Sequence, residues 1–153
     1  MKAKRMPLVM LLLAISVLAT AQQEKPKEPA KSVSNVFTVN DANTVLARFR
    51  SALEAHSQRQ MFALFDGEKM TAYVSFQDQM RGFLSRNEGI RVNIRGIQAS
   101  GESDKGVITA TFEIETTSRT GNASRRSEQL RLELNRTAQG WRIVDINPRS
   151  FFS

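Results

Sequence analysis

The sequence predicts an α+β domain in which N-terminal helices pack on one face of a four-stranded antiparallel sheet. Apolar residues recur at helical spacing over residues 40–87, and the period changes to two from Ile90 onward. Loops divide the alternating part of the chain into four successive segments, as in an antiparallel meander. Because the helices come first and the strands follow, the two kinds of element should form separate layers.

The clearest strand pattern is the stretch of residues 129–146. Leu130, Leu132 and Leu134 alternate with polar residues, which is typical of a strand with one buried and one solvated face. Residues 135–140 are polar and end in glycine, which predicts a hairpin turn. Residues 141–146 are apolar on both faces, so this last strand is expected to lie inside the sheet.

Three helices are expected before the sheet. Asn40 or Asp41 would cap the first helix, and Ser57 begins the capping pattern S-x-x-Q of a short second helix. The third helix is expected over residues 70–87, with Gly89 as its left-handed C-terminal cap. The apolar residues that should face the sheet are Val45, Leu46, Phe49, Ala52 and Leu53, then Met61, Phe62, Leu64 and Phe65, then Tyr73, Phe76, Met80, Phe83 and Leu84.

The outer face of the sheet should carry alternating charges. The first strand is expected from Ile90, with a bulge where Gly96 and Ile97 break the alternation. We interpret the outer face as a solvated surface, with a surface for a partner as the alternative. Its charged residues are Arg91, Arg95, Glu113, Glu115, Arg131 and Glu133.

The composition excludes several kinds of site. The 153 residues include no cysteine, which excludes disulfides, thiolate zinc sites, cysteine nucleophiles and a lipoprotein anchor. The net charge is +7, but Lys2, Lys4 and Arg5 lie in a leader without acidic residues, so 7 − 3 leaves +4. This mild charge requires no nucleic-acid partner.

Residues 1–21 have the pattern of a signal peptide. A basic start precedes a short apolar run and the Ala19-Thr20-Ala21 cleavage pattern, which predicts a periplasmic or secreted protein with no stable membrane anchor after cleavage. The alternative, an uncleaved anchor, is disfavoured because a membrane span needs about 20 apolar residues. Residues 22–38 are rich in Lys, Glu and Pro and are expected to form a flexible tether. Residues 39–153 would then form a single domain.

Three stretches carry a resemblance to a known family. They are Ala52-Leu53-Glu54-Ala55 in the first helix, Leu64-Phe65-Asp66 at the end of the second, and Gly140-Trp141-Arg142-Ile143-Val144-Asp145 in the last strand. With the order of the elements, they resemble the nuclear transport factor 2-like superfamily, the cystatin-like α+β cone. The resemblance implies a curved sheet wrapped around helices with a pocket between them. Family members include isomerases, dehydratases, polyketide cyclases and binding modules, and a homodimer through the sheet would be expected.

Few residues are suited to proton transfer. Asp145 would be a general base if its face of the strand points toward the helices, but it would also fit an ion pair with Arg142 or Arg149. Tyr73 would donate a hydrogen bond to a ligand in the same pocket, or be a core residue with its hydroxyl at the edge, and Trp141 completes the expected pocket. His56 fits the end of the first helix better than a metal site. No cofactor or metal is expected.

The favoured function is an exported non-catalytic domain that binds a small apolar ligand or a protein partner. One alternative is a small enzyme of the isomerase, dehydratase or cyclase kind with Asp145 as base and Tyr73 as hydrogen-bond donor. Another is a cell-envelope interaction module that uses the charged sheet face.

Overall fold

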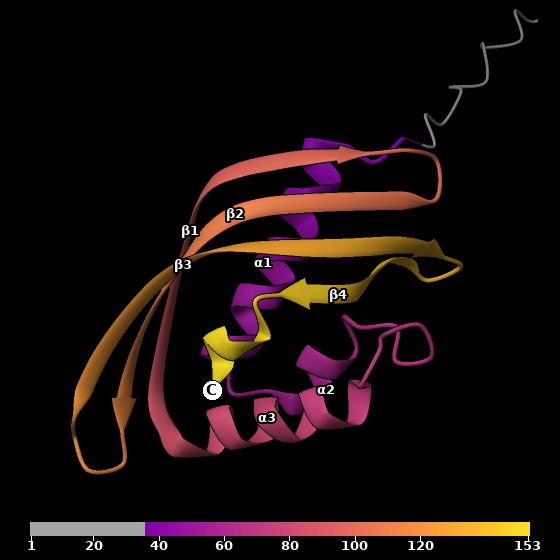
Figure 1. The fold of residues 1–153 in the computed structure, drawn as a ribbon. Coiled ribbons are helices and arrows are strands. Elements are labelled where there is room, and N and C mark those ends of the chain that lie inside the picture. Colours follow the sequence, from indigo (N-terminus) through magenta and orange to yellow (C-terminus); the bar gives the residue numbers. More distant parts are fainter. Residues whose placement is uncertain (1–35) are drawn as a thin grey trace, which may run out of the picture. The chain divides into compact units, whose positions relative to one another are not determined.

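The computed structural model describes residues 36–153, which contain three α-helices, four strands and a C-terminal 3-10 turn (Figure 1). The predicted signal peptide, residues 1–21, and the tether up to residue 35 lie outside the described residues. The elements are α1 Val39–Glu54, α2 Gln58–Phe62, α3 Tyr73–Arg86, β1 Asn87–Gly101, β2 Lys105–Ser118, β3 Ala123–Thr137, β4 Gly140–Asn147 and the 3-10 turn η1 Arg149–Phe152.

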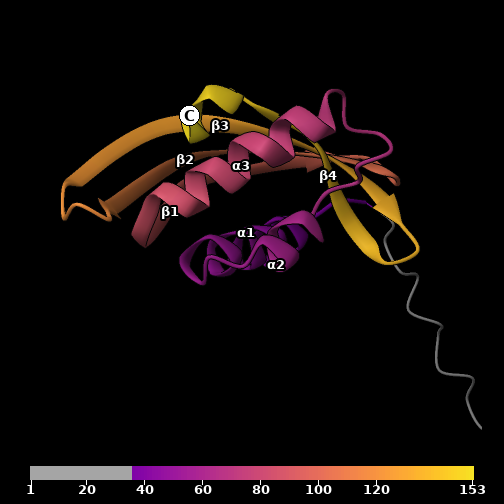
Figure 2. The same ribbon diagram turned by 90° about the horizontal axis from the view of Figure 1, so that it is seen from below.

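The sheet is an antiparallel meander in the order β1-β2-β3-β4. The strands curve, and the helices lie on the concave side (Figure 2). The predicted α+β architecture with helices on one face of four antiparallel strands is therefore confirmed. The expectation that the last strand lies inside the sheet was wrong, because β4 is an edge strand. Its outer backbone edge is bonded instead by the segment after α2, where the Asp66 N–H donates to the Ile143 carbonyl and the Ile143 N–H donates to the Leu64 carbonyl.

Besides a shift at the start of β1, between Asn87 and Gly89, two irregularities change the direction of strand side chains. The predicted bulge at Gly96 is confirmed, since the β1–β2 register shifts between Arg95 and Gln98 and Gly96 has a φ of +65°. A second shift lies in β4, where Glu133 pairs with Asp145 but Leu134 pairs with Ile143. Ile143 and Asp145 therefore point to opposite faces of the sheet, although a regular strand would place them on one face.

The expectation that Asn40 or Asp41 caps α1 was wrong, because the cap lies two residues before Asn40. Thr38 is the N-cap, and its hydroxyl accepts the Asp41 N–H at 3.2 Å. The Asp41 carboxylate in turn accepts the Thr38 N–H at 2.9 Å. Asp41 is thus the third helical residue of a capping box rather than the cap itself.

We expect Thr38→Ala to lower the free energy of unfolding by about 1 kcal/mol, because it removes the hydroxyl that satisfies the Asp41 N–H. Urea denaturation followed by circular dichroism measures the change. Thr44→Ala is the matched control, since Thr44 is an exposed residue of α1 whose hydroxyl only bonds back to Asn40. Equal losses in both variants would contradict the capping role.

The predicted start of α2 is confirmed, whereas the predicted end of α3 was wrong. Ser57 caps α2 as expected, with its hydroxyl accepting the Gln60 N–H at 3.3 Å. The expected left-handed cap at Gly89 was wrong, because β1 begins at Asn87 directly after α3. The Asn87 side chain donates to the Phe83 carbonyl at 2.7 Å and closes the helix end, and Gly89 lies within the strand.

Phenylalanine rings occupy the space between the helices and the sheet. Phe49 of α1 lies 5.8 Å from Phe112 of β2 and 6.1 Å from Phe152 of η1, ring centre to ring centre. Phe152 also contacts Phe83 of α3 edge to face at 5.7 Å. Among the described residues, the buried polar side chains are Glu113 and Thr116. The interior is thus mainly a packed apolar core.

The segment that enters α1 is also anchored. Phe37 is buried, and its ring lies 4.7 Å from the ring of Trp141 on β4. The same phenylalanine packs against Gly101 and Gly106 at the end of the β1–β2 hairpin, where a β-carbon would leave it no room. Val36 and Val39, on either side of this segment, are about half exposed, at 51% and 54%.

Candidate functional site

Three depressions are lined in part by β1, and we call them together the β1-edge groove. The first, of about 670 Å³, lies at the end of α1 and extends over the adjoining ends of β2 and β3. The second, of about 580 Å³, is lined by Arg91, Val92 and Asn93 of β1 and by two glutamates of β2, and it shares Glu54 with the first. The third, of about 170 Å³, is lined by Asn43, Leu46, Ala47, Arg50, Ile94 and Ile97. Another depression, between α1 and α2, lies away from this strand but shares Ala47 with the third.

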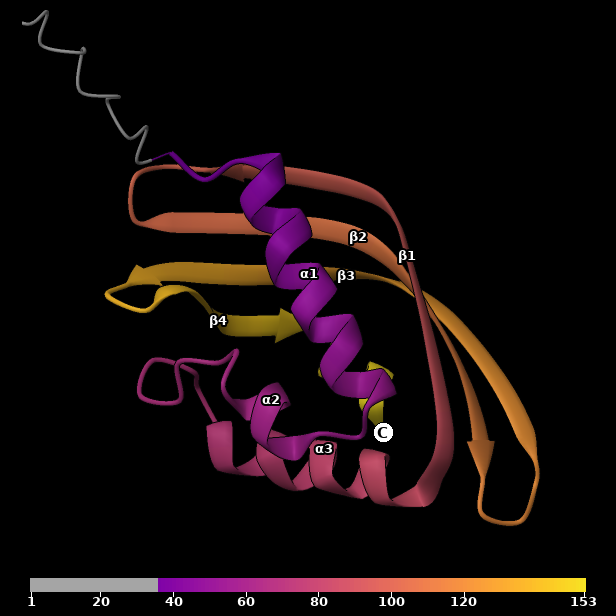
Figure 3. The same cartoon turned by 180° about the vertical axis from the view of Figure 1, so that it is seen from behind.

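Helix α1 forms one wall of the groove. Asn43, Ala47, Arg50 and Glu54 are spaced by four, three and four residues, so they lie on one helix face. All four are exposed, whereas the neighbouring stripe of α1 is buried against the sheet. Figure 3 shows α1 crossing in front of the sheet, with its C-terminal end beside the descending part of β1.

The backbone of β1 forms the other wall. Val92 N–H points away from β2 and donates to the Glu54 carboxylate at 3.0 Å. The β1–β2 register is regular from Ile90 to Arg95, and outward backbone groups alternate along such a strand. Ile90 and Ile94 therefore also present their N–H and C=O groups to the groove. The opposite edge of the sheet, on β4, is bonded by the segment after α2, as described above.

The charges along the groove are only partly paired. Among residues 36–153, Arg50 and Arg91 form no ion pair. On the convex face, Glu113 is buried between Arg95, at 3.4 Å, and Arg125. Two arginines therefore already share that carboxylate. Glu54 and Glu88, which also line the groove, form no ion pair within residues 36–153 either, so unpaired charges of both signs lie along the strand edge.

His56 lies at the first depression, just after α1. Its Nε2 atom is enclosed and has no hydrogen-bond partner in the described part of the chain. Its φ of +53° is uncommon for a residue other than glycine. His56 therefore follows the helix as a turn residue, and its position at the end of α1 agrees with the sequence.

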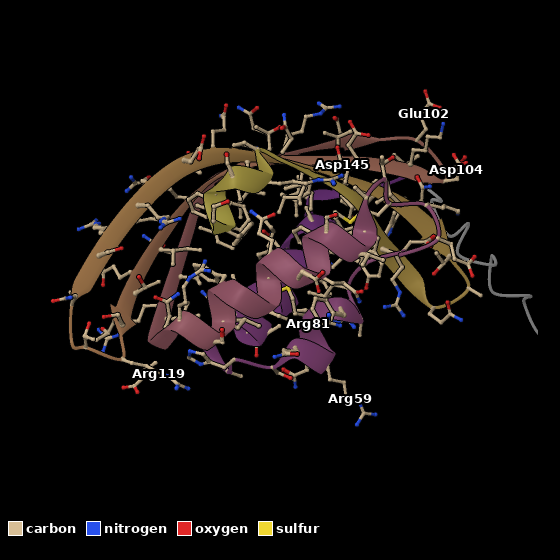
Figure 4. The ribbon with its side chains drawn as sticks, turned by 60° about the horizontal axis from the view of Figure 1, so that its bottom comes forward. Arg59, Arg81, Glu102, Asp104, Arg119 and Asp145 are labelled. Atoms are coloured by element: carbon tan, nitrogen blue, oxygen red, sulfur yellow. The ribbon has the colours of Figure 1, made fainter. Side chains whose placement is uncertain are left out.

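The structure does not bring the three predicted pocket residues to one face. Trp141 packs on Phe37 and lies 5.8 Å from the Arg136 guanidinium. Asp145 is in register with Glu133, whose face points away from the helices, and it accepts a hydrogen bond from Arg149 at 2.5 Å. Figure 4 shows Asp145 on β4 next to η1. The bulge in β4 places Trp141 and Asp145 on opposite faces of the sheet, and no pattern in the sequence predicts this bulge.

Tyr73 is half buried at the start of α3. Its ring lies against Gly67, where an added β-carbon would approach ring atoms to 2.5 Å. None of Tyr73, Trp141 and Asp145 lines the β1-edge groove. Their proposed roles in a pocket stay predictions.

The sequence interpretation missed the α1 wall of the groove. Asn43, Ala47 and Arg50 drew no attention because they lie on the polar side of an amphipathic helix. Glu54 was noted only as part of the family resemblance. The position of Glu54 could have indicated the groove. A glutamate in the last turn of a helix is electrostatically unfavourable unless another group compensates its charge.

No helix within residues 36–153 is both long and apolar enough to span a membrane. The same residues contain no group of three or more histidine, cysteine or acidic side chains arranged to hold a metal ion.

Comparison with known proteins gives matches in structure only. No family model matches the sequence, and no curated protein matches it. A nuclear transport factor 2-like superfamily protein from Salmonella enterica superposes with a TM-score of 0.65 at 10% identity, covering 76% of this chain and 90% of that one. A candidate aromatic ring hydroxylase from Novosphingobium aromaticivorans has a TM-score of 0.65 at 12% identity, covering 72% and 88%.

A candidate dehydratase of the nuclear transport factor 2-like family from Streptomyces avermitilis also superposes on the domain. Its TM-score is 0.58 at 12% identity, with 71% of this chain and 92% of that chain covered. At such identities the likeness concerns the fold and leaves the activity open. Three helices on the concave side of an unclosed antiparallel sheet, matched by these structures, establish that the domain has the nuclear transport factor 2-like fold.

Proposed function

We propose that this chain is an exported, non-catalytic domain that binds a protein partner through the β1-edge groove. The observation that carries the proposal is the contrast between a filled interior and an open strand edge. Phe49, Phe112 and Phe152 meet in the space between helices and sheet, while the backbone of β1 is accessible beside α1. Export is inferred from the signal-peptide pattern of residues 1–21.

The position of the acidic groups favours binding over catalysis. A general base needs to lie within hydrogen-bond reach of a bound substrate. Asp145 lies on the side of the sheet away from the helices and is bonded to Arg149, and Arg149 is held in turn by the Thr71 carbonyl at 2.8 Å. The buried Glu113 is also on the outer face, where two arginines neutralise it.

The groove favours a polypeptide over a small apolar ligand. Its walls combine outward backbone groups with both charged and apolar side chains. Such a lining suits an extended chain, which brings its own backbone donors and acceptors. A small apolar ligand would leave these polar groups without partners.

We expect site-specific photo-crosslinking to trap a partner from the groove. A benzophenone amino acid would replace Ala47 in the full chain, expressed in the cells that naturally produce it, because Ala47 is exposed in the groove. The control position is Val74 of α3, which is 69% exposed and outside the groove. A discrete crosslinked polypeptide at position 47, absent at 74, is expected, and equal crosslinking at both would contradict the proposal.

Native mass spectrometry of the same exported protein tests the alternatives. Cleavage after Ala21 should give a chain that begins at Gln22, and an unprocessed mass would contradict export. A small-molecule mass that denaturation removes would contradict the proposal and favour a ligand-binding or enzymatic role.

A further inference from the structure

We infer that the β1-edge groove binds an extended polypeptide segment as an additional strand, and that this segment alternates apolar and acidic residues. This inference rests on the proposed function and specifies its partner by chemistry. Each feature of the expected segment follows from one wall of the groove.

The backbone of β1 fixes the binding mode. Ile90, Val92 and Ile94 direct their N–H and C=O groups away from β2, and in the described structure β1 pairs with β2 alone. An added strand would bond these groups at the spacing of a regular ladder. The Val92 N–H already has a carboxylate acceptor 3.0 Å away, so an acceptor can reach this edge.

The concave wall fixes the apolar half of the pattern. The third depression is lined by the apolar side chains of Leu46, Ala47, Ile94 and Ile97. Every second side chain of an added strand would point to this side, toward α1. Its volume of about 170 Å³ is enough for an aliphatic side chain.

The unpaired arginines fix the acidic half. The remaining side chains of an added strand would point to the convex side, where Arg91 and Arg95 project from β1. Arg91 has no ion pair among residues 36–153, so an acidic side chain of the incoming segment would lie beside an unpaired cation. Arg50, also unpaired, lies on the α1 side and would attract the acidic segment over a longer distance.

Glu54 occupies the place of an incoming carbonyl. Its carboxylate accepts the Val92 N–H, although it lies at the C-terminal end of α1, where negative charge is disfavoured. An added strand would have to displace it. Glu54 thus protects a free strand edge and also competes with the proposed segment.

The test begins with a random dodecapeptide library displayed on phage and selected against the exported protein. Enriched sequences should alternate apolar and acidic residues, and the most enriched one would be made as a synthetic peptide. Its binding should slow hydrogen exchange at the amides of Ile90 and Ile94 by about tenfold or more, because they become bonded to a strand. This readout follows strand addition directly.

Three variants test the walls of the groove. Arg50→Glu combined with Arg91→Glu should weaken binding of the selected peptide about tenfold or more. The charge-matched control is Arg59→Glu combined with Arg81→Glu, on α2 and α3, and it should bind as the parent does because neither arginine lines the groove. Glu54→Ala should bind the peptide about tenfold more tightly, because the competing carboxylate is gone.

Several results would overturn the inference. They are the absence of enriched peptides, equal weakening by both charge-reversal pairs, and peptide binding without slower exchange at Ile90 and Ile94. These amides could also exchange slowly in the protein alone, and more slowly at higher protein concentration. That result would indicate that a second copy of the chain occupies the groove, and it would also overturn the inference. A crosslinked partner at Ala47 together with any of these results would leave the proposed function standing and remove only strand addition.

Discussion

Phe152→Ala is expected to remove about 3–5 kcal/mol from the free energy of unfolding. The ring is fully buried and meets three other rings, which are Phe49 in α1, Phe83 in α3 and the adjacent Phe151 in η1 itself. Its removal would leave a cavity at the point where both long helices and the sheet converge, and packed interiors relax only partly around such a cavity. A loss of this size is a large fraction of the stability of an ordinary domain.

Denaturant unfolding measures the effect, and Val74→Ala serves as control because Val74 is 69% exposed. The control should change the free energy of unfolding by less than about 0.5 kcal/mol. Side-chain hydrogen bonds also hold the η1 backbone in place. Gln79 donates to the Arg149 carbonyl at 2.7 Å, and Arg126 donates to the Phe151 carbonyl at 2.8 Å. A loss below about 1 kcal/mol for Phe152→Ala would show that η1 contributes little to the core.

Gly101→Ala is expected to cost about 1–3 kcal/mol, through crowding rather than through a cavity. A β-carbon there would overlap the Lys105 carbonyl oxygen and approach the Gly106 Cα to 2.8 Å and the Phe37 Cβ to 2.9 Å. Two of these three neighbours are backbone atoms, which cannot rotate away. The end of the β1–β2 hairpin would have to open, and the Phe37 ring that packs on it would shift.

Gly89→Ala is the matched control for the hairpin variant. Gly89 lies in the same strand, and a β-carbon there would make only an ordinary contact of 3.5 Å with Thr117. Thermal or urea unfolding should therefore separate the two alanine variants clearly. If both lost the same stability, the general cost of changing a glycine would explain the result, and the crowding at Gly101 would not.

The sequence predicted the fold class because each layer has its own period. The stripe of Val45, Phe49 and Leu53 could face only a core, and the alternation of Leu130, Leu132 and Leu134 required a sheet with one buried face. Local chemistry was also sufficient at Ser57, where a side chain and a backbone group three residues apart decide the helix start.

What could not be predicted depends on tertiary geometry. The bulge in β4 inserts one residue between two apolar positions, so Asp145 turns to the outer face without any change in the sequence pattern. The last strand is apolar on both faces, yet it lies at an edge, because a loop near Phe65 covers it in place of a strand. Both facts depend on which segments meet, and periodicity carries no such information.

The groove could not be predicted either, because it also depends on which segments meet in the folded domain. Its walls come from α1 and β1, and in the sequence Glu54 and Val92 are separated by two other helices. Each wall considered alone resembles an ordinary solvated surface. Only their juxtaposition places a carboxylate on a free strand N–H.

Because Phe37 contacts Trp141, tryptophan fluorescence can report whether the segment entering α1 is attached to the domain. Trp141 is the only tryptophan in the sequence, so the intrinsic emission of the protein comes from the place where the segment entering α1 packs against β4. Release of that segment would expose the indole to water while the phenylalanine core stays intact. Fluorescence therefore follows detachment of the N-terminal segment, and circular dichroism follows collapse of the whole domain, so the two events can be told apart without any label.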